Sequence, residues 1–212
     1  MPSSNDLSTR AKDQWPQVVV TLLSIVQALA LELLWDHVND KDYLYHFSWP
    51  AVLGWAEIGA TLVGVVLIWV IYSTMTMRFR WVPTIRDLVF PFVIGIIELA
   101  LIASLGVATI GIWFLLLALV YAAMAWESQM LMRRARLDGD NDMFFKHVPE
   151  ATLRDFVPTF IVVGALALIG LYLWSTRDQG AIAFVALLAA NGGLVYQLWL
   201  NNHFWRRSVG LA

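Results

Sequence analysis

The chain alternates long apolar stretches with short polar connections over most of its 212 residues. Each stretch is close to the roughly 20 residues that a helix rising about 1.5 Å per residue needs to cross a hydrocarbon core of about 30 Å. The pattern therefore predicts an all-α polytopic membrane protein built as one bundle of six transmembrane helices. The expected spans are residues 16–37, 51–75, 88–106, 108–131, 156–175 and 181–201.

Polar residues mark the ends of these spans and define the remaining parts of the chain. We expect a polar N-terminal segment over 1–15, a single transmembrane domain over 16–205, a cytoplasmic loop over 132–155 and a tail over 206–212. Gly106 leaves only a very short turn between the third and fourth spans.

The sequence DGDND in the 132–155 loop has the acidic character of a calcium loop. An EF-hand requires glycine at its sixth position and a bidentate glutamate at its twelfth. Counted from Asp138, these positions hold Met143 and Pro149. We therefore expect a solvated acidic turn instead of a calcium site.

The composition strengthens the membrane assignment. Hydrophobic residues make up 59% of the chain and charged residues 14%, whereas soluble domains average about 45–50% and about 25%. The net charge of −2 and the lack of a basic stripe give no indication of nucleic-acid binding. The chain has no cysteine, which excludes disulfides and thiol chemistry.

The basic residues predict the orientation of the bundle. Twelve Lys and Arg residues fall in the two termini and in the 76–87 and 132–155 loops, whereas the opposite side holds only Lys41 and Arg177. Cytoplasmic loops of membrane proteins carry such an excess of positive charge. We therefore expect both termini to be cytoplasmic, in a bacterial inner (plasma) membrane.

Two cytoplasmic entries into the bundle have similar sequences. TIRDLVFPF (84–92) leads into the third span and TLRDFVPTF (152–160) into the fifth. The likeness suggests three repeated helical hairpins, each entering from the cytoplasm. The alternative is that Asp and Pro recur there because both suit the first turn of a helix.

Three glutamates interrupt the apolar spans at similar expected depths: Glu32, Glu57 and Glu98. Carboxylates held close together in a low dielectric cannot all be ionised unless a cation is bound, so the trio predicts an ion-binding or proton-relay site. The alternative is that each one hydrogen-bonds across helices and only specifies packing. The expected polar lining of the site is Gln27, Asn191 and Gln197.

A second polar group lies beyond the first span, where Asp36 and His37 form an expected outer rim. His37, Asp40, Asp42 and His46 are weak candidates for metal ligands, because helical histidine ligands recur at i and i+4 and these histidines are nine residues apart. Attraction of cations to the surface, or ordinary solvation, explains the same residues.

The sequence thus favours an ion channel or transporter for protons or another cation, without an identifiable cofactor beyond a bound cation. Two alternatives remain: a non-catalytic assembly or scaffold subunit of a larger membrane complex, and a membrane enzyme using the outer acid and histidine residues. We expect the lipid bilayer and either further copies of the chain or unlike membrane subunits as partners. No nucleophile elbow, phosphate loop or zinc-protease pattern predicts catalysis.

Overall fold

The computed structural model describes residues 4–146 and 148–208 as helices joined by short connections, and no strand occurs in these residues. Six helices of 19 residues or more follow the six apolar stretches of the sequence. They are α1 (Ser4–Asp40), α2 (Trp49–Arg78), α3 (Ile85–Ala103), α4 (Ile110–Arg136), α6 (Val157–Thr176) and α7 (Ala181–Ser208). The short elements are η1 (Asp42–Tyr45), η2 (Gly139–Asn141), α5 (Asp142–Phe145) and η3 (Leu153–Phe156).

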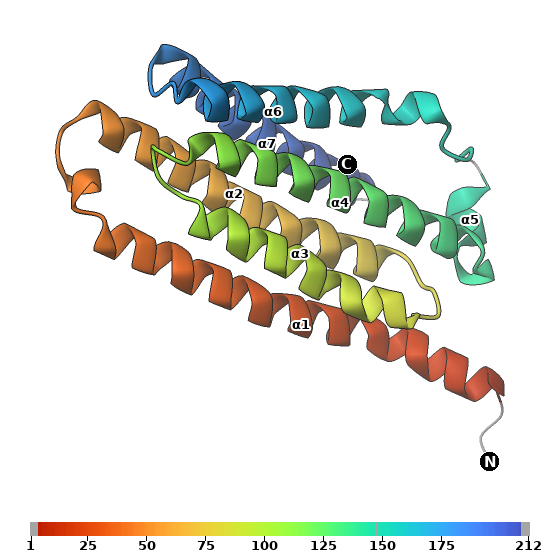
Figure 1. Cartoon of the computed structure of the whole chain (residues 1–212). Coiled ribbons are helices and arrows are strands. Elements are labelled where there is room, and N and C mark those ends of the chain that lie inside the picture. Colours follow the sequence, from red (N-terminus) through yellow and green to blue (C-terminus); the bar gives the residue numbers. More distant parts are fainter. Residues whose placement is uncertain (1–3, 147, 209–212) are drawn as a thin grey trace.

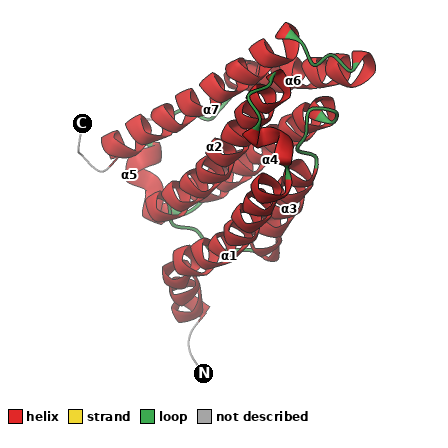
Figure 2. Ribbon diagram, turned by 90° about the vertical axis from the view of Figure 1, so that its left-hand side faces the viewer, coloured by secondary structure: helices red, strands yellow, loops and turns green. Residues whose placement is uncertain are grey.

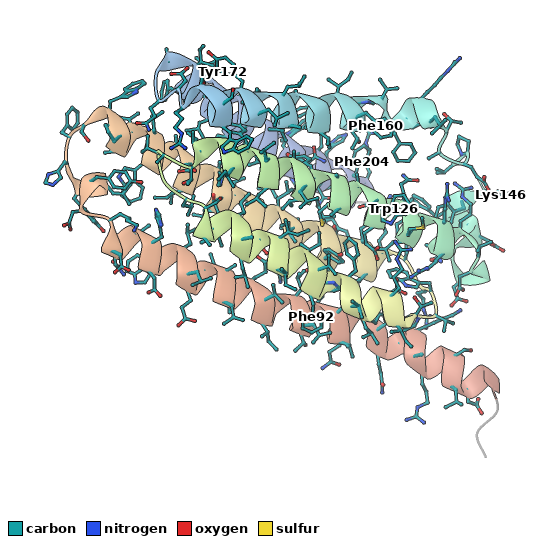
Figure 3. All side chains as sticks on the ribbon, in the orientation of Figure 1. Phe92, Trp126, Lys146, Phe160, Tyr172 and Phe204 are labelled. Carbon is teal, nitrogen blue, oxygen red and sulfur yellow. The ribbon has the colours of Figure 1, made fainter. Side chains whose placement is uncertain are left out.

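Five of these helices, α1, α2, α4, α6 and α7, are long and apolar enough to cross a membrane. Helix α3 has 19 residues, of which Arg86, Asp87 and Glu98 are charged, and it is not one of the five. Large apolar side chains, including Phe92 and Phe160, are exposed on the outside of the bundle (Figure 3). A bilayer would cover these side chains, which supports the assignment as a membrane protein.

The helices form a bundle in which α1 packs on α2 and α3, α3 packs on α4, α4 packs on α6, and α2 packs on α7 (Figure 1). The most extensive of these contacts joins α4 and α6. Helices α6 and α7 are joined by a short turn, yet they make few contacts because α7 runs away from α6 toward its C-terminal end (Figures 1 and 2).

The helix bounds differ from the expected spans mainly at the start of α1 and the end of α7. Helix α1 begins at Ser4, so most of the polar segment expected over 1–15 belongs to the same helix as the first apolar stretch, with Pro16 inside it. Helix α7 likewise continues to Ser208, and the rest of the expected tail lies outside the described residues. Hydropathy alone underestimates these helices because the first turns of α1 and the last turns of α7 are polar.

The acidic turn expected to be solvated is instead anchored to helix α1. The ammonium group of Lys12 lies 2.7 Å from a carboxylate oxygen of Asp138 and 3.1 Å from one of Asp140. The side-chain amide of Asn141 donates to the carbonyls of Arg80 and Ala135 at 2.6 and 2.7 Å. These bonds tie the N-terminal helix to the α4–α6 connection, and that connection to the one between α2 and α3, so the DGDND turn has a structural role.

The two similar segments that lead into α3 and α6 share the same local structure. Thr84 with Asp87, and Thr152 with Asp155, each form a capping box, in which the Asp side chain accepts from the Thr backbone N–H at 2.7 Å and from the Thr hydroxyl at 3.0 Å. Their surroundings differ, because Asp87 is buried and Asp155 is exposed. The shared motif explains the sequence likeness through helix capping, which does not require a repeated hairpin.

The contact between α4 and α6 is closest where two glycines face each other. A Cβ atom on Gly111 would lie 2.7 Å from Cα of Trp174 and 2.8 Å from the carbonyl oxygen of Gly170. These neighbours are backbone atoms, which cannot move aside as a side chain can. Small residues of this kind allow the close helix approach that membrane bundles depend on.

We expect Gly111→Ala to lower the stability of the bundle by about 1–3 kcal/mol, the usual cost of overpacking. Gly164→Ala on α6 is the matched control, because a Cβ atom there meets nothing within 4 Å. Thermal unfolding of the purified protein in detergent checks both variants. Equal unfolding temperatures for the two variants would contradict the close contact.

Candidate functional site

Glu57 on α2 is enclosed by protein and is only 1% exposed. One oxygen of its carboxyl group, Oε2, accepts from the backbone N–H of Gly106 at 3.0 Å. Gly106 forms the turn between α3 and α4 with φ = 141°, a conformation that favours glycine. The other oxygen, Oε1, is buried without a hydrogen-bond partner. The tight turn foreseen at Gly106 therefore also supplies a donor to Glu57.

Buried polar and aromatic contacts join α2 to α4 one turn along from Glu57. The hydroxyl of Thr61 donates to the backbone carbonyl of Glu57 at 2.9 Å and accepts from Nε1 of Trp113 at 3.0 Å. Trp113 and Phe114 are fully buried and pack edge to face with ring centroids 5.0 Å apart. These contacts hold this part of α2 against α4.

Glu98 on α3 is also only 1% exposed and is bound from α1. The side-chain amide of Gln27 donates to its Oε2 at 2.9 Å, while its Oε1 has no hydrogen-bond partner. The helices are close here, because a Cβ atom on Gly95 would collide with the side chain of Val26. Gln27, expected as polar lining, is thus the hydrogen-bond partner of Glu98.

Glu32 lies apart from both, on the outside of the bundle. On α1, Val26, Ala30 and Leu34 are buried at a spacing of four residues. Glu32 follows Ala30 by two residues, which places it about 200° round a helix of 3.6 residues per turn. The direction of its side chain therefore separates Glu32 from the interior of the bundle.

Glu57 and Glu98 do not share a partner in the part of the chain that the structure describes. Glu57 is bound to the outer turn, and Glu98 is bound to Gln27 and lines an internal cavity that Glu57 does not reach. The structure therefore gives two separate buried carboxyl positions in place of the single trio that the sequence suggests.

The cavity has a volume of about 580 Å³ and lies between α2, α4, α6 and α7. Its walls are mostly apolar, with Glu98 and Leu101 as the contribution of α3. The residues from α6 and η3 belong to the N-terminal end of α6, and those from α7 belong to its C-terminal half. The cavity therefore occupies the half of the bundle where α6 and α7 diverge.

The two other expected lining residues differ in their roles. Asn191 donates to the carbonyls of Ala56 and Leu187, both at 2.9 Å, and so joins α7 to α2. Gln197 lines the cavity. Asn191 is better explained by helix packing, and Gln197 keeps its expected position as polar lining.

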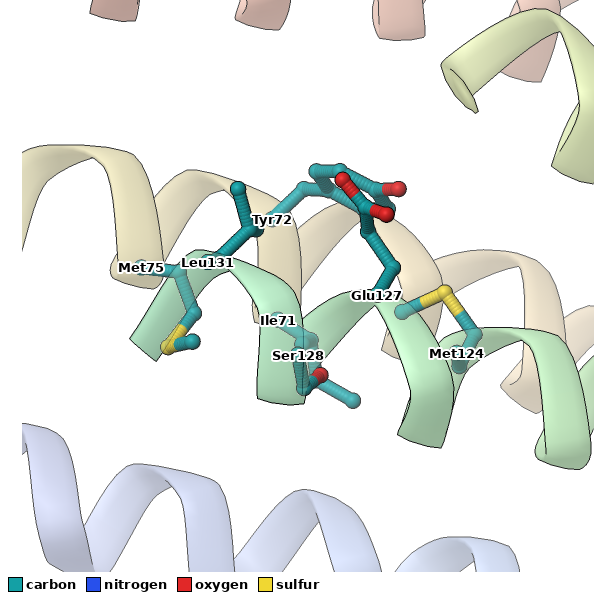
Figure 4. Close-up of a pocket in the computed structure, with 7 residues that line it drawn as sticks. All are labelled: Ile71, Tyr72, Met75, Met124, Glu127, Ser128 and Leu131. Atoms are coloured by element: carbon teal, nitrogen blue, oxygen red, sulfur yellow. The ribbon is translucent and has the colours of Figure 1, made fainter. Parts of the chain in front are cut away.

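A buried charged group at the inner end of the bundle was not foreseen from the sequence. Asp87 on α3 forms an ion pair with Arg134 on α4, and Nη2 of Arg86 lies 3.8 Å from a carboxylate oxygen of Glu127. Glu127 is only 2% exposed and lines a hollow of about 10 Å³ together with Tyr72 (Figure 4). The only sequence feature that pointed to this group was the spacing of seven residues between Glu127 and Arg134, which puts both on one face of a helix.

The outer acid and histidine residues do not assemble into a metal site. Within residues 4–146 and 148–208, no group of three or more His, Asp or Glu residues has a metal-binding arrangement. Asp36, Asp40, Asp42 and His46 are exposed, and His37 is half-buried. This agrees with solvation as the main role of these side chains.

Aromatic packing organises this outer connection instead. Nε1 of Trp55 donates to the Leu44 carbonyl at 2.9 Å. A Cβ atom on Gly54 would lie within 3 Å of both Leu44 and Tyr43, so η1 rests directly on α2. Burial raises the pKa of the Tyr43 hydroxyl above its usual value. The glycine on α2 therefore serves the packing of the loop.

Comparison with known proteins returns no family model, curated protein or solved structure that matches the chain. The side chains described above therefore carry the functional proposal.

We expect Asp87→Asn to destabilise the protein by about 2–3 kcal/mol. Removing one partner of a fully buried ion pair costs roughly 3–5 kcal/mol, and the loss is smaller here because 23% of the Arg134 side chain stays exposed. Asp155→Asn changes the same capping motif where the carboxylate is exposed, so its effect should be much smaller. Denaturant unfolding in detergent measures both, and similar losses would show that the ion pair adds nothing to the cap.

Proposed function

We propose that the chain is an integral membrane channel or transporter that moves protons or another cation by way of the buried carboxyl groups of Glu57 and Glu98. The observation that carries the proposal is the enclosure of both groups, each 1% exposed and each with one oxygen lacking a hydrogen-bond partner. A carboxyl group in such surroundings takes up a proton or a cation, because an isolated buried charge is costly.

The topology that goes with this function uses α3 as a sixth span. Nineteen residues at about 1.5 Å each give α3 a length of roughly 28 Å, close to the thickness of a hydrocarbon core. The positive charges near the ends of α2, α4 and α7 then lie on the cytoplasmic side, with both termini. In a bacterial inner membrane, the cavity is open to the cytoplasmic half, and Glu57 lies toward the outer face.

Replacement of either carboxyl group by an amide should reduce flux at least tenfold. Glu57→Gln and Glu98→Gln keep the size of the side chain and remove its capacity to exchange a proton or hold a cation. Purified protein in liposomes, with an imposed proton or cation gradient and a fluorescent indicator inside, measures the flux. Glu150→Gln, which changes an exposed carboxylate outside the long helices, is the control. Wild-type flux in both Glu57→Gln and Glu98→Gln would rule out this route.

A second function, assembly of a larger membrane complex, is favoured by Glu32. This side chain is exposed on an apolar stretch of α1 between Leu31 and Leu33, which are also exposed. A carboxyl group facing lipid is costly, so such residues usually meet protein. The outer side of α1 is therefore the surface on which we place a partner subunit.

If α1 is this assembly surface, Glu32→Leu should release the partner. Native mass spectrometry after extraction in a mild detergent would show a stoichiometric unlike subunit with the wild-type chain and its loss in the variant. Asp36→Asn, one turn further along at the aqueous rim, should keep the partner bound. Isolation of the wild-type chain as a single species would contradict the assembly role.

A further inference from the structure

All charged side chains among the described residues that line the large cavity are acidic. They are Glu98 and Asp155, and none of these lining residues is Lys, Arg or His. Asp155 is exposed where α6 begins, and Glu98 lies at the enclosed side against α1. A positively charged molecule would thus meet a carboxyl group both where it enters and where it comes to rest.

The size and chemistry of the walls suit an organic molecule better than a bare inorganic ion. A volume of about 580 Å³ falls within the roughly 300–1,000 Å³ typical of pockets that hold small organic molecules. Leu, Ile and Val side chains cover much of the surface, and such walls do not replace the hydration shell of an inorganic ion. Tyr121, Phe156 and Tyr196 add aromatic groups, which attract organic cations through their ring faces.

Glu98 places one polar group in the wall of this apolar cavity. Its Oε2 is held by Gln27, which fixes the carboxyl group, and its Oε1 is buried without a hydrogen-bond partner. One oxygen is thereby oriented, and the other has no hydrogen-bond partner among the described residues. A positively charged group of a ligand would pair with that second oxygen while its apolar part fills the cavity.

The route into the cavity passes between α6 and α7. These helices separate toward the N-terminal end of α6 and the C-terminal end of α7, and residues from both of these ends line the cavity (Figures 1 and 2). The neighbouring outer surfaces carry exposed Phe160, Tyr196 and Trp199. An entrance of this kind suits a molecule that partitions into the bilayer.

We infer that the cavity between α2, α4, α6 and α7 binds a hydrophobic organic cation, with its positive group at Glu98. The inference rests on the proposed function and names its substrate class: the transported cation is carried on an apolar body. It follows from the acidic charge of the cavity, its apolar walls and its volume, together with the carboxyl group that Gln27 orients.

Tetraphenylphosphonium and tetraphenylborate test the inference, because the two have nearly the same shape and opposite charge. Equilibrium dialysis against the full chain in lipid nanodiscs, with empty nanodiscs subtracted, should show one tetraphenylphosphonium bound per chain and no tetraphenylborate. Glu98→Gln should weaken binding at least tenfold, and Glu150→Gln should leave it unchanged. Equal binding of both probes, or binding that survives Glu98→Gln, would overturn the inference.

Two neighbouring glycines on α7 give a test that does not touch the carboxyl group. Gly193 lines the cavity and Gly192 does not, and a Cβ atom on either meets nothing within 4 Å. Gly193→Phe should therefore fill the space and reduce tetraphenylphosphonium binding at least tenfold, while Gly192→Phe should bind as the wild type does. Loss of binding in both variants, or in neither, would contradict the cavity as the site.

Probe binding and flux measured on the same protein distinguish a wrong substrate class from a wrong transport function. If Glu98→Gln abolishes proton or inorganic cation flux but the wild-type chain binds no tetraphenylphosphonium, the substrate class is wrong and transport stands. If the probe binds as expected but no gradient is dissipated by the wild-type chain, the binding site stands and transport is wrong. Purification with a tightly bound phospholipid in the cavity, undisplaced by the probe, would also overturn the inference.

Discussion

The structure depends on one constraint: a carboxyl group enclosed in an apolar bundle must be given donors, a proton or a cation. Glu57 and Glu98 each receive one donor from a neighbouring element, through Gly106 and Gln27 respectively. Each bond also fixes how two helices or a turn meet, so packing and chemistry use the same groups. Among the described residues, the second oxygen of each carboxyl group has no hydrogen-bond partner, and in the proposed function this oxygen would take up the proton or cation.

The order of the long helices and the positions of their apolar parts could be predicted from hydropathy, because a helix in lipid must be apolar over a fixed length. The direction of a side chain could be predicted only where neighbours on the same helix fixed it. On α1 the buried positions Val26, Ala30 and Leu34 turn Glu32 outward, but Glu32 has the same depth and residue type as the buried pair. The expected depth of a residue follows from its place in the sequence, whereas the direction of its side chain depends on which helices are adjacent.

The inner end of the bundle was the least predictable part for a related reason. Lys12, Asp138 and Asp140 lie far apart in the sequence and in segments that appear merely solvated. Their pairing depends on α1 extending beyond the apolar stretch, which hydropathy does not reveal. The capping motifs of Asp87 and Asp155 are likewise alike in sequence, but Asp87 is buried and Asp155 is exposed. The motif alone therefore does not predict burial.

The glycine contact between α4 and α6 has a mechanical consequence. It lies near the outer end of both helices, about 20 Å from the first residue of α6, at 13 residues of roughly 1.5 Å each. Over that length, a tilt of α6 by about 5° at Gly170 would displace Val157 by roughly 1.7 Å. Because the backbones of α4 and α6 already touch at Gly111 and Gly170, a side chain added at either glycine would change this angle. The distance between the first turn of α6 and α7 would then change with it.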